Sequence, residues 1–541
     1  LPIIDWDFRF QRPQQLATEL AERGHRVFYV ETQIRNNINN APFIKPIKEK
    51  IFSVQLSSAD RFIDVYSLLT EEQVNDLEKS IQELRDHFLI NAAVVMVDSP
   101  IWSKLAIRLK ERFGWKLVYD CMDLHIGFSE KNHATHLKER NLLKNSDKVF
   151  VSSHYLYDHV NSEGIHPSLI PNGTDFDFFH QASKPIPNNE IQSLLKPILG
   201  YYGAIADWFD TELIGELAAR HPEWTFVLIG NTFLADLEPL RGLPNIHLLG
   251  EKPYSELPSY LSHFDVCLIP FKDIPLTQAT NPVKLYEYLS AGKAVVATRL
   301  HELSFFSDYA NLAQSIEEWE KAIQDSLNEK KTSELLQERY DFAKINTWEV
   351  RANVIEDELF DLYPMVSIII VSFNNHEYSK FCLESIQKNT SYPNYEIIIV
   401  DNGSKNRTIL YLKEIQKIHN RITVVFNNNN LGFSKANNQG AELAKGEYLV
   451  FLNNDTIVTP GWMHRLLNHL KSSKKIGMVG PVTNAIGNEA KINVTLEEIT
   501  QMNSFAAQRA RSYADKHFDI DVLALYCCMI PREIFAVVGG L

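Results

Sequence analysis

The sequence predicts an α/β protein built from parallel sheets that are covered by helices on both faces. Short apolar stretches alternate with helical stretches along almost all of the 541 residues. RVFYVE (26–31) and AVVMVD (93–98) have the length and apolar character of buried strands, whereas RPQQLATELAERG (12–24) has the spacing of a helix. Strands that alternate with helices form parallel sheets, because each parallel crossover needs a connection that packs on the sheet.

Two breaks divide this alternation into domains. The polar, proline-rich stretch QASKPIPNNE (181–190) has the composition of a linker. A long helical pattern then ends at Pro364, and new strand-like stretches begin at Val366. The length also suits three or four domains at roughly 150 residues each. The sequence therefore predicts three domains, which cover residues 1–185, 186–363 and 364–541.

The composition excludes several kinds of protein. The net charge is −14 and no stretch is rich in Lys and Arg, which argues against nucleic acid as a partner. No apolar stretch approaches the roughly 20 residues that a membrane-spanning helix needs. The five cysteines show no metal-binding or CxxC spacing, so we expect a reducing, cytoplasmic location. The absence of a signal peptide and the start at Leu1 rather than Met predict a trimmed fragment.

Polar side chains follow three predicted strands of the third domain. Residues 372–374 follow VSIIIV, residues 401–404 follow YEIIIV, and residues 453–455 follow YLVFL. In open α/β sheets, ligands bind outside the carboxyl ends of the strands, so these residues would face one crevice if the strands are neighbours. There Asp401 could hydrogen-bond a base or a ribose, and Asp455 could hold Mg²⁺ or Mn²⁺. Such a cation takes one or two carboxylates plus phosphate oxygens and neutralises a diphosphate leaving group.

Simpler explanations compete with this site. DNG (401–403) is typical of turns wherever it occurs. The alternative for NND (453–455) is that it merely caps the helix suggested by TPGWMHRLLNHL. We favour a ligand site because three strand ends within one domain carry such residues.

The third domain resembles the family 2 glycosyltransferases of GT-A fold over residues 366–541. The motifs that support this are VSIIIVSFNN, CLESI, YEIIIVDNGS, NLGFSKANNQGAELAKGEYLVFLNNDT and GPVTNAIGNE, in this order. The resemblance implies that Phe373 and Asp401 contact the nucleotide base, with Ser404 in the same cluster. It also implies that Asn438 supports the nucleotide-sugar pocket and that Asp455, at the family's D-x-D position, binds the metal and takes part in catalysis.

Two departures from the family pattern affect the expected chemistry. Asn453 stands where the family has the first Asp, and an amide can bind a ribose hydroxyl but adds no negative charge, so we expect weaker metal affinity. The family's inverting mechanism uses a carboxylate base shortly after a GG-(F/L)-DE turn. This sequence ends in REIFAVVGGL at Leu541, so we expect that base beyond Leu541 and poor sugar transfer by the truncated domain.

The first two domains resemble family 4 glycosyltransferases of GT-B fold over residues 1–363. The matching motifs are IPNGTDFDFF (170–179), LGYYGAIADWFD (199–210) and NPVKLYEYLSAGKAVVAT (281–298). The resemblance implies two Rossmann-like lobes, of which the first holds the acceptor and the second holds the donor nucleotide. A helix near residues 348–363 would cross back onto the first lobe.

Residues in these motifs suit a nucleotide diphosphate. Gly200 and Gly203 would let the backbone approach a phosphate at a strand-to-helix turn. Lys284 and Glu287 are three residues apart on a predicted helix, so they share a face. There Lys284 would neutralise the diphosphate and Glu287 would accept both ribose hydroxyls. The alternative is a surface ion pair between Lys284 and Glu287.

The first lobe departs from the family and offers other candidates. Ala279 stands where family 4 enzymes often have the first of two Glu residues. The stretch DWDFRFQRPQQLA (5–17) replaces the usual glycine-rich loop, and Arg12 in it would bind phosphate bidentately or else pack on Trp6 or in a surface pair. Asp120 and Asp123 follow a predicted strand and are candidates for orienting or deprotonating the acceptor hydroxyl.

We therefore expect a bifunctional glycosyltransferase that moves sugars from UDP-, GDP- or dTDP-sugars to hydroxyls of a growing glycan, such as a surface polysaccharide or a lipid-linked glycan. The amphipathic, basic stretch 462–475 would be either a surface helix or a peripheral contact with the inner face of a membrane. A nucleotide-sugar-binding or glycan-binding scaffold without catalysis is the alternative. A dinucleotide-dependent oxidoreductase is disfavoured, because no G-x-G-x-x-G precedes a suitably placed acidic residue.

Overall fold

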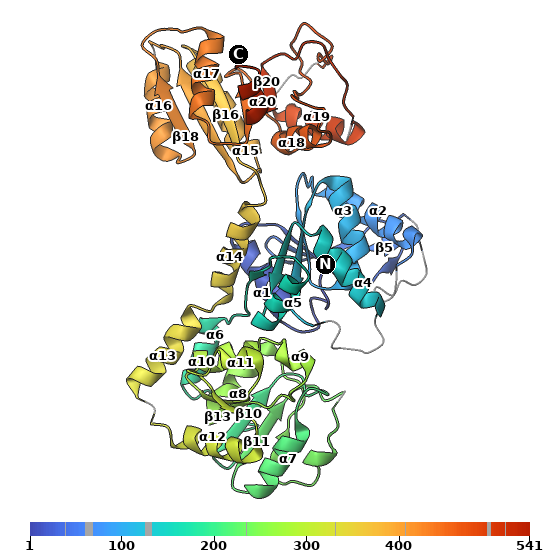
Figure 1. The fold of residues 1–541 in the computed structure, drawn as a ribbon, viewed down its shortest axis with the longest axis vertical. Helices are drawn as coiled ribbons and strands as arrows, with labels where there is room; N and C mark the ends of the chain where they lie inside the picture. Colours follow the sequence, from blue (N-terminus) through green and yellow to red (C-terminus); the bar gives the residue numbers. More distant parts are fainter. Residues whose placement is uncertain are drawn as a thin grey trace. The chain divides into compact units, whose positions relative to one another are not determined.

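The computed structural model describes residues 1–541 except 38, 60–68, 125–132, 234, 331, 406, 495–498 and 514–515 (Figure 1). Tertiary contacts divide the chain into two units. Unit 1 comprises Leu1–Glu83 and Val94–Glu356, and unit 2 comprises Leu84–Ala93 and Asp357–Leu541. The three-domain division expected from the sequence stays a prediction.

The first lobe of unit 1 is built on two main sheets. Its strands are β1 (Val27–Val30), β2 (Arg35–Asn36), β3 (Phe43–Lys48), β4 (Ile51–Gln55), β5 (Ser57–Ser58), β6 (Val94–Val97), β7 (Lys116–Cys121), β8 (Lys148–Val151) and β9 (Ser168–Leu169). Its helices are α1 (Arg12–Glu22), α2 (Glu71–His87, of which the residues from Leu84 belong to unit 2), α3 (Ser103–Phe113), α4 (His133–Asn145) and α5 (His154–Ser162). The sheet β6-β7-β8-β9 is parallel throughout, whereas in β1-β4-β3 the edge strand β3 runs antiparallel.

The second lobe of unit 1 is a six-stranded parallel sheet in the order β12-β11-β10-β13-β14-β15. These strands are β10 (Ile198–Tyr202), β11 (Thr225–Ile229), β12 (Ile246–Leu248), β13 (Val266–Ile269), β14 (Ala294–Thr298) and β15 (Asn311–Ala313). The helices are α6 (Phe176–His180), α7 (Thr211–Arg220), α8 (Leu257–His263), α9 (Pro275–Gln278), α10 (Val283–Ser290), α11 (His301–Ser304), α12 (Ile316–Asn328) and α13 (Ser333–Lys344). Strands β10, β11, β13 and β14 are buried along their whole length, as expected for a sheet with helices on both faces.

Gly200 serves this packing. A Cβ added at Gly200, in the middle of β10, would lie 2.1 Å from a ring carbon of Phe264. The position therefore needs glycine so that the Phe264 ring can lie against the strand. This corrects the expectation that Gly200 exposes backbone to a phosphate.

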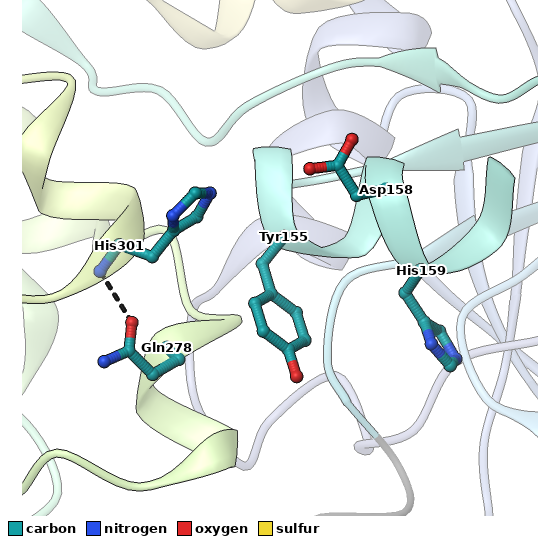
Figure 2. Close-up of a pocket in the computed structure, with 5 residues that line it drawn as sticks. All are labelled: Tyr155, Asp158, His159, Gln278 and His301. Atoms are coloured by element: carbon teal, nitrogen blue, oxygen red, sulfur yellow. Dashed lines mark hydrogen bonds between the residues drawn. The ribbon is translucent and has the colours of Figure 1, made fainter. Parts of the chain in front are cut away.

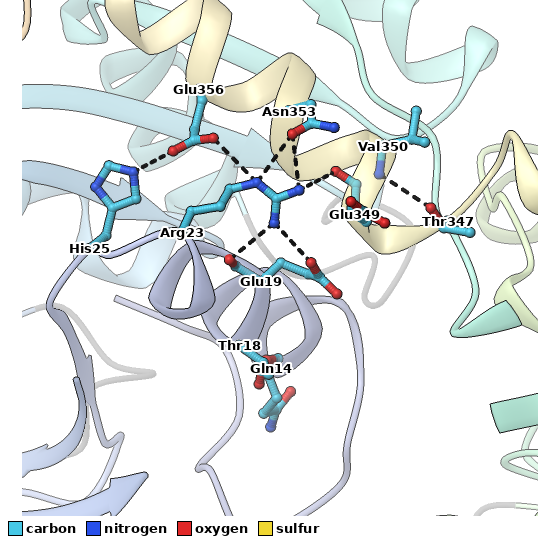
Figure 3. Close-up of polar contacts among 10 residues, drawn as sticks. All are labelled: Gln14, Thr18, Glu19, Arg23, His25, Thr347, Glu349, Val350, Asn353 and Glu356. Carbon is cyan, nitrogen blue, oxygen red and sulfur yellow. Dashed lines mark hydrogen bonds and ion pairs between the residues drawn. The ribbon is translucent and has the colours of Figure 1, made fainter. Parts of the chain in front are cut away.

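Helix α14 (Trp348–Phe360) contacts α1 through polar side chains, as Figure 3 shows. The guanidinium of Arg23 donates to Asn353 Oδ1 at 2.9 Å and lies 3.2 Å from a carboxylate oxygen of Glu356. Arg23, the residue after α1, also pairs with Glu19 of that helix at 2.9 Å, and His25 Nε2 lies 2.6 Å from Glu356. These groups are partly exposed, so each pair contributes at most about 1 kcal/mol and mainly fixes the position of α14.

Unit 2 is a five-stranded sheet in the order β18-β17-β16-β19-β20. Its strands are β16 (Val366–Ser372), β17 (Tyr395–Asp401), β18 (Ile422–Phe426), β19 (Tyr448–Leu452) and β20 (Cys527–Pro531). Its helices are α15 (His376–Asn389), α16 (Arg407–Ile418), α17 (Phe433–Leu443), α18 (Trp462–Lys471), α19 (Ile499–Ser512) and α20 (Arg532–Val537). The first four strands are parallel, and β20 joins β19 antiparallel.

Both faces of this sheet are covered. Ile368 on β16 packs in one core with Leu383 of α15 and Leu412 of α16. The next residue, Ile369, points to the opposite face and packs with Phe535 of α20. The predicted α/β class with parallel sheets is thus confirmed in both units.

Helix α18 uses its apolar face inside unit 2. Trp462, Met463, Leu466, Leu467 and Leu470 are all buried there. This favours the surface-helix interpretation over a membrane contact, because the apolar side that would enter a bilayer is already covered by protein. Within the described residues, no helix has both the length and the apolar character that crossing a bilayer requires.

Candidate functional site

Gly203, Lys284 and Glu287 meet at the end of β10 in the second lobe. A Cβ added at Gly203 would lie 3.1 Å from Lys284 Cε and 3.3 Å from its amine, so the missing side chain makes room for the lysine. Gly203 also has a φ of +136°, a conformation that favours glycine. Lys284 comes from the first turn of α10 and lies over the aromatic rings of Tyr201 and Phe271, at 5.3 and 4.9 Å from their centroids.

The alternative surface ion pair is not what the structure shows. Glu287 is buried, with 4% of its surface exposed, and no ion pair within 4.0 Å joins it to Lys284 among the described residues. Burial lowers the pKa of Lys284 to about 8, which the negative charge of Glu287 partly opposes. Burial raises the pKa of Glu287 to about 7, against the effects of the nearby Tyr202 hydroxyl and Lys284 charge. Lys284 therefore has no carboxylate partner among the described residues, and an anionic ligand would supply a partner of opposite charge.

Glu287→Gln is expected to raise the free energy of unfolding at pH 8 but not at pH 4. The folded-state pKa of about 7 lies above the ordinary 4.5, so ionisation of Glu287 opposes folding increasingly between these pH values. The full effect above pH 7 is about 3 kcal/mol. Denaturant titrations at both pH values measure it, with exposed Glu256→Gln as the matched control. An equal change at pH 4 and pH 8 would contradict the assignment.

The sequence predicted an anion site formed by Gly203 and the N-terminus of the next helix, but that helix end is not free for an anion. Helix α7 begins only at Thr211, and its N-cap residue Asp210 already accepts a hydrogen bond from the Leu213 N–H. A carboxylate thus occupies the helix end. The predicted phosphate contact of Gly203 therefore depends on the loop backbone and on Lys284.

Arg12 and Asp120 form a buried ion pair in the first lobe. Arg12 Nε and Nη2 donate to the two carboxylate oxygens of Asp120 at 2.8 and 2.9 Å. Arg12 Nη1 donates to the Pro171 carbonyl and to Asn172 Oδ1, at 3.2 and 3.3 Å. Four of the five N–H groups of Arg12 are thus used within the protein. This geometry favours a structural role for Arg12. It disfavours the three roles considered from the sequence, namely a phosphate contact, packing on Trp6 and a surface pair.

Asp123 differs from Asp120 in its surroundings. Its carboxylate is half-buried and accepts no hydrogen bond from the described residues. Burial raises its pKa to about 6, helped by the negative charge of Asp120 and opposed by Arg12. A carboxylate with a pKa near neutrality is suited to accept a proton, so Asp123 remains the better candidate of the two for deprotonating an acceptor.

A cavity of about 390 Å³, lined by polar and apolar surface, lies between elements of the two lobes in unit 1 (Figure 2). Its lining residues are Tyr155, Asp158 and His159 from α5 with Gln278 and His301 from α9 and α11. The His301 N–H donates to Gln278 Oε1 at 2.6 Å, which holds the second-lobe side of the cavity. Sequence reasoning missed these residues, because only the i, i+4 spacing of Tyr155 and His159 hints at a shared face.

The polar strand ends of unit 2 lie at one edge of the sheet. Ser372 pairs with Asp401 across β16 and β17, and Ile369 pairs with Phe451 across β16 and β19. Because these strands are parallel neighbours, their carboxyl ends meet, as the strand-end argument required. The expectation that these three strands are neighbours is confirmed.

Asp401 has one carboxylate oxygen without a partner. Its side chain is 1% exposed, Oδ2 accepts a hydrogen bond from the Ser404 N–H at 3.1 Å, and Oδ1 is buried without a partner among the described residues. A buried acceptor that lacks a donor is costly unless a ligand supplies one. Asp401 therefore fits the predicted contact with a nucleotide.

Phe373 and Ser404 flank Asp401. Phe373 is exposed, so its ring is available to a ligand. Ser404 Oγ accepts the N–H of Asn374 at 2.9 Å, and Asn374 has a positive φ of 58°. This bond ties the end of β16 to the loop after β17. Ser404 thus has a structural partner, although its hydroxyl can still donate.

Asp455 is the exposed member of the third strand end. The N–H of Asn453 donates to the Tyr526 carbonyl at 2.8 Å, and Asn454 Nδ2 donates to Ser379 Oγ at 3.0 Å. Asp455 accepts no hydrogen bond from the described residues, and no group of three His, Cys, Asp or Glu side chains suited to a metal occurs among them. One carboxylate fits Mg²⁺ or Mn²⁺ when phosphates and water complete the shell.

Asn438 has a different use from the predicted one. Its Nδ2 donates to the Leu541 carbonyl at 3.0 Å, and its Oδ1 accepts the Leu541 N–H at 2.9 Å. Gly539 and Gly540 just before have φ values of +83° and +88°. The Asn438 amide thus holds the Gly-Gly-Leu turn by its backbone. Support of the nucleotide-sugar pocket by Asn438 would be indirect, through this turn.

Comparisons with known proteins agree with this arrangement. Residues 367–535 match the model of "Glycosyl transferase family 2", and residues 196–329 match the model of "Glycosyl transferases group 1". The first range contains Asp401 and Asp455, and the second contains Gly203, Lys284 and Glu287.

Curated relatives are matched over part of their length. The putative teichuronic acid biosynthesis glycosyltransferase TuaH of Bacillus subtilis is 32% identical over 217 residues, which cover 36% of this chain and 54% of TuaH. The putative glycosyltransferase EpsH of the same organism is 34% identical over 104 residues, 19% of this chain and 30% of EpsH. The chain thus spans about half of TuaH and less of EpsH.

Solved structures share the fold. Sucrose-phosphate synthase from Thermosynechococcus elongatus superposes with a TM-score of 0.52 at 18% identity, over 65% of this chain and 92% of that one. An α,α-trehalose-phosphate synthase from Burkholderia vietnamiensis superposes with a TM-score of 0.50 at 11% identity, over 65% and 98%. These likenesses show the GT-B fold alone. The chain therefore contains a region that matches the group 1 glycosyltransferases, within a GT-B fold, and a region that matches glycosyltransferase family 2.

Proposed function

We propose that the chain is a glycosyltransferase with two donor sites, one in the second lobe of unit 1 and one in unit 2. The observation that carries the proposal is the pair of incomplete polar sites. Lys284 lies against Gly203 without a carboxylate partner among the described residues, and Asp401 has a buried, unpartnered oxygen. Each lies at the carboxyl ends of parallel strands, where nucleotides bind in such folds.

In unit 1, the sugar would move from a nucleotide-sugar to an acceptor hydroxyl. The bond between the anomeric carbon and the diphosphate breaks, and a new bond forms to the acceptor oxygen. Lys284 stabilises the negative charge that develops on the diphosphate, and Glu287 accepts hydrogen bonds from the ribose. Asp123 takes the proton of the acceptor hydroxyl, for which its pKa of about 6 is suited.

In unit 2, Asp401 would accept a hydrogen bond from the nucleotide through Oδ1, and the exposed Phe373 ring would contact the base. Asn453 would bind a ribose hydroxyl. Asp455 would hold Mg²⁺ or Mn²⁺, which when bound neutralises the diphosphate. Ser404 and Asn438 would position the loops around this site through the backbone contacts described above.

The acceptor belongs to the same proposal. The printed description of TuaH refers to teichuronic acid biosynthesis, and we propose a surface polysaccharide or a lipid-linked glycan as acceptor here. The cavity of Figure 2 offers hydroxyl-binding side chains in unit 1. A cytoplasmic location and the three domains 1–185, 186–363 and 364–541 are also parts of this proposal.

Release of UDP, GDP or dTDP from matched nucleotide-sugars tests the function. The full chain is assayed with glycan acceptors, with Mn²⁺ or with EDTA, beside Lys284→Ala and Asp401→Ala. We expect release that each substitution lowers in part, with the Asp401-dependent part lost in EDTA. Tight nucleotide binding without release would favour the scaffold alternative, and absence of binding would contradict both.

A further inference from the structure

Asn172 lies where three segments of unit 1 meet. Its N–H donates to Asn281 Oδ1 at 3.0 Å, and its Nδ2 donates to the Asn281 carbonyl at 2.6 Å. Its Oδ1 accepts from Arg12 Nη1 at 3.3 Å, and its carbonyl accepts from Arg351 Nε at 3.2 Å. One residue thus joins α1, α14 and the segment before α10 with all four of its polar groups.

Asn281 continues these bonds into the second lobe. Its side chain is 2% exposed, and its Nδ2 donates to Glu302 Oε1 at 2.8 Å. The other oxygen of the fully buried Glu302 accepts the N–H of His154, the first residue of α5, at 2.8 Å. The bonds therefore run from the first lobe through Asn281 and back to the first lobe.

The position of Asn281 matters for the donor helix. It directly precedes Pro282, the N-cap residue of α10, and no side chain caps this helix. The first turn of an uncapped helix is weakly held, because its N–H groups lack intrahelical partners. Lys284 lies in that turn, with its amine near Gly203. The bonds of Asn281 to Asn172 thus fix the chain directly before this turn, in addition to the packing of the Lys284 side chain against Gly203, Tyr201 and Phe271.

We propose that Asn172 and Asn281 are positioning residues of the unit 1 donor site, whose reciprocal pair holds the first turn of α10 so that the Lys284 amine stays against Gly203. Because Asn172 also accepts a hydrogen bond from Arg12, which pairs with Asp120, the position of α10 depends on these two residues of the first lobe. This inference rests on the proposed donor role of Lys284.

The test measures the amine of Lys284 without any nucleotide. Trace acetylation of the full chain across pH 6 to 11, read by mass spectrometry of the Lys284 peptide, gives the apparent pKa of this amine. In the unchanged protein we expect about 8, because the amine is buried. In Asn281→Ala we expect a shift toward 10.5, because the released turn lets the amine reach water.

Asn172→Asp is the second variant, and it is the milder one. It keeps an acceptor for Arg12 but loses the donor to the Asn281 carbonyl, so we expect the same direction of shift. UDP affinity in an Asp401→Ala background, where the unit 2 site is impaired, should fall about tenfold for each variant at pH 7, the worth of one or two hydrogen bonds.

Asn245→Ala is the matched control in the same lobe. Asn245 is also buried, and its Nδ2 donates to the carbonyls of Ala218, His221 and Trp224, away from α10. We expect a lower melting temperature with no change in the Lys284 titration. An unchanged Lys284 titration in both Asn281→Ala and Asn172→Asp, or an equal shift in Asn245→Ala, would overturn the proposal. A shift in the first two without UDP binding by the parent would uphold the positioning and contradict the donor function.

Discussion

Lys284→Ala is expected to weaken UDP binding by unit 1 about 100-fold at pH 7, because a charge-assisted contact to a diphosphate is lost from a half-buried site. The unchanged protein should also lose affinity above pH 8, where its amine, with a pKa of about 8, releases its proton before the ligand arrives. Below that pH the amine is already charged, so its titration no longer changes the affinity. In the variant the fall above pH 8 should disappear.

Calorimetry with UDP, GDP and dTDP in an Asp401→Ala background measures this, with EDTA present. The matched control is Lys196→Ala, because Lys196 is an exposed lysine of the same lobe that pairs with Asp265 at 2.8 Å. It should bind as the parent does. A Lys284→Ala variant that keeps both its affinity and its pH dependence would remove the diphosphate role of Lys284.

Asp455→Asn is expected to lower the metal-dependent transfer by unit 2 at least about 100-fold, because a divalent cation at a diphosphate contributes several kcal/mol to the stabilisation of the transition state. Asp455 supplies the one carboxylate at this strand end, so little negative charge remains to hold the cation. Nucleotide release during a Mn²⁺ titration, in a Lys284→Ala background, measures the effect.

Asn453→Asp provides the opposite test. It adds a second carboxylate to the strand end, so the Mn²⁺ concentration for half-maximal release should fall severalfold. Asp519→Asn, an exposed carboxylate elsewhere in unit 2, is the matched control and should leave the titration unchanged. If Asp455→Asn responds to Mn²⁺ as the parent does, the metal binds elsewhere.

The strand ends of unit 2 were predictable from the sequence for a physical reason. A buried parallel strand has a continuous apolar pattern, and the polar residue that ends it marks the sheet edge. Ser372, Asp401 and Asn453 therefore lie at one edge, as the register of β16, β17 and β19 shows. In the same way, the helical spacing of Lys284 and Glu287 predicted their shared helix. Their separate pKa shifts were not predictable, since burial decides them.

The partners of Arg12 and Asn438 could not be predicted from the local sequence pattern, because they lie far away along the chain. Arg12 pairs with Asp120, which is 108 residues away, and Asn438 holds Leu541, which is 103 residues away. From the sequence, Asn438 was expected to support a ligand pocket, and Arg12 was expected to bind phosphate, to pack on Trp6 or to form a surface pair. Folding buries Arg12 and brings Asn438 onto the turn at Leu541, so their hydrogen-bonding groups are used within the protein.

The sequence by itself thus determined the α/β class, the strand ends and the helix that carries Lys284, because these follow from periodicity and from residue type over short spans. Only the tertiary structure decided which polar groups remain free for a ligand. A hydrogen-bonding group is satisfied by whatever the fold places within about 3 Å of it, and segments more than a hundred residues apart supply many of these partners. In the folded protein, Asp401 has a carboxylate oxygen without a partner among the described residues, whereas the guanidinium of Arg12 is bound to Asp120.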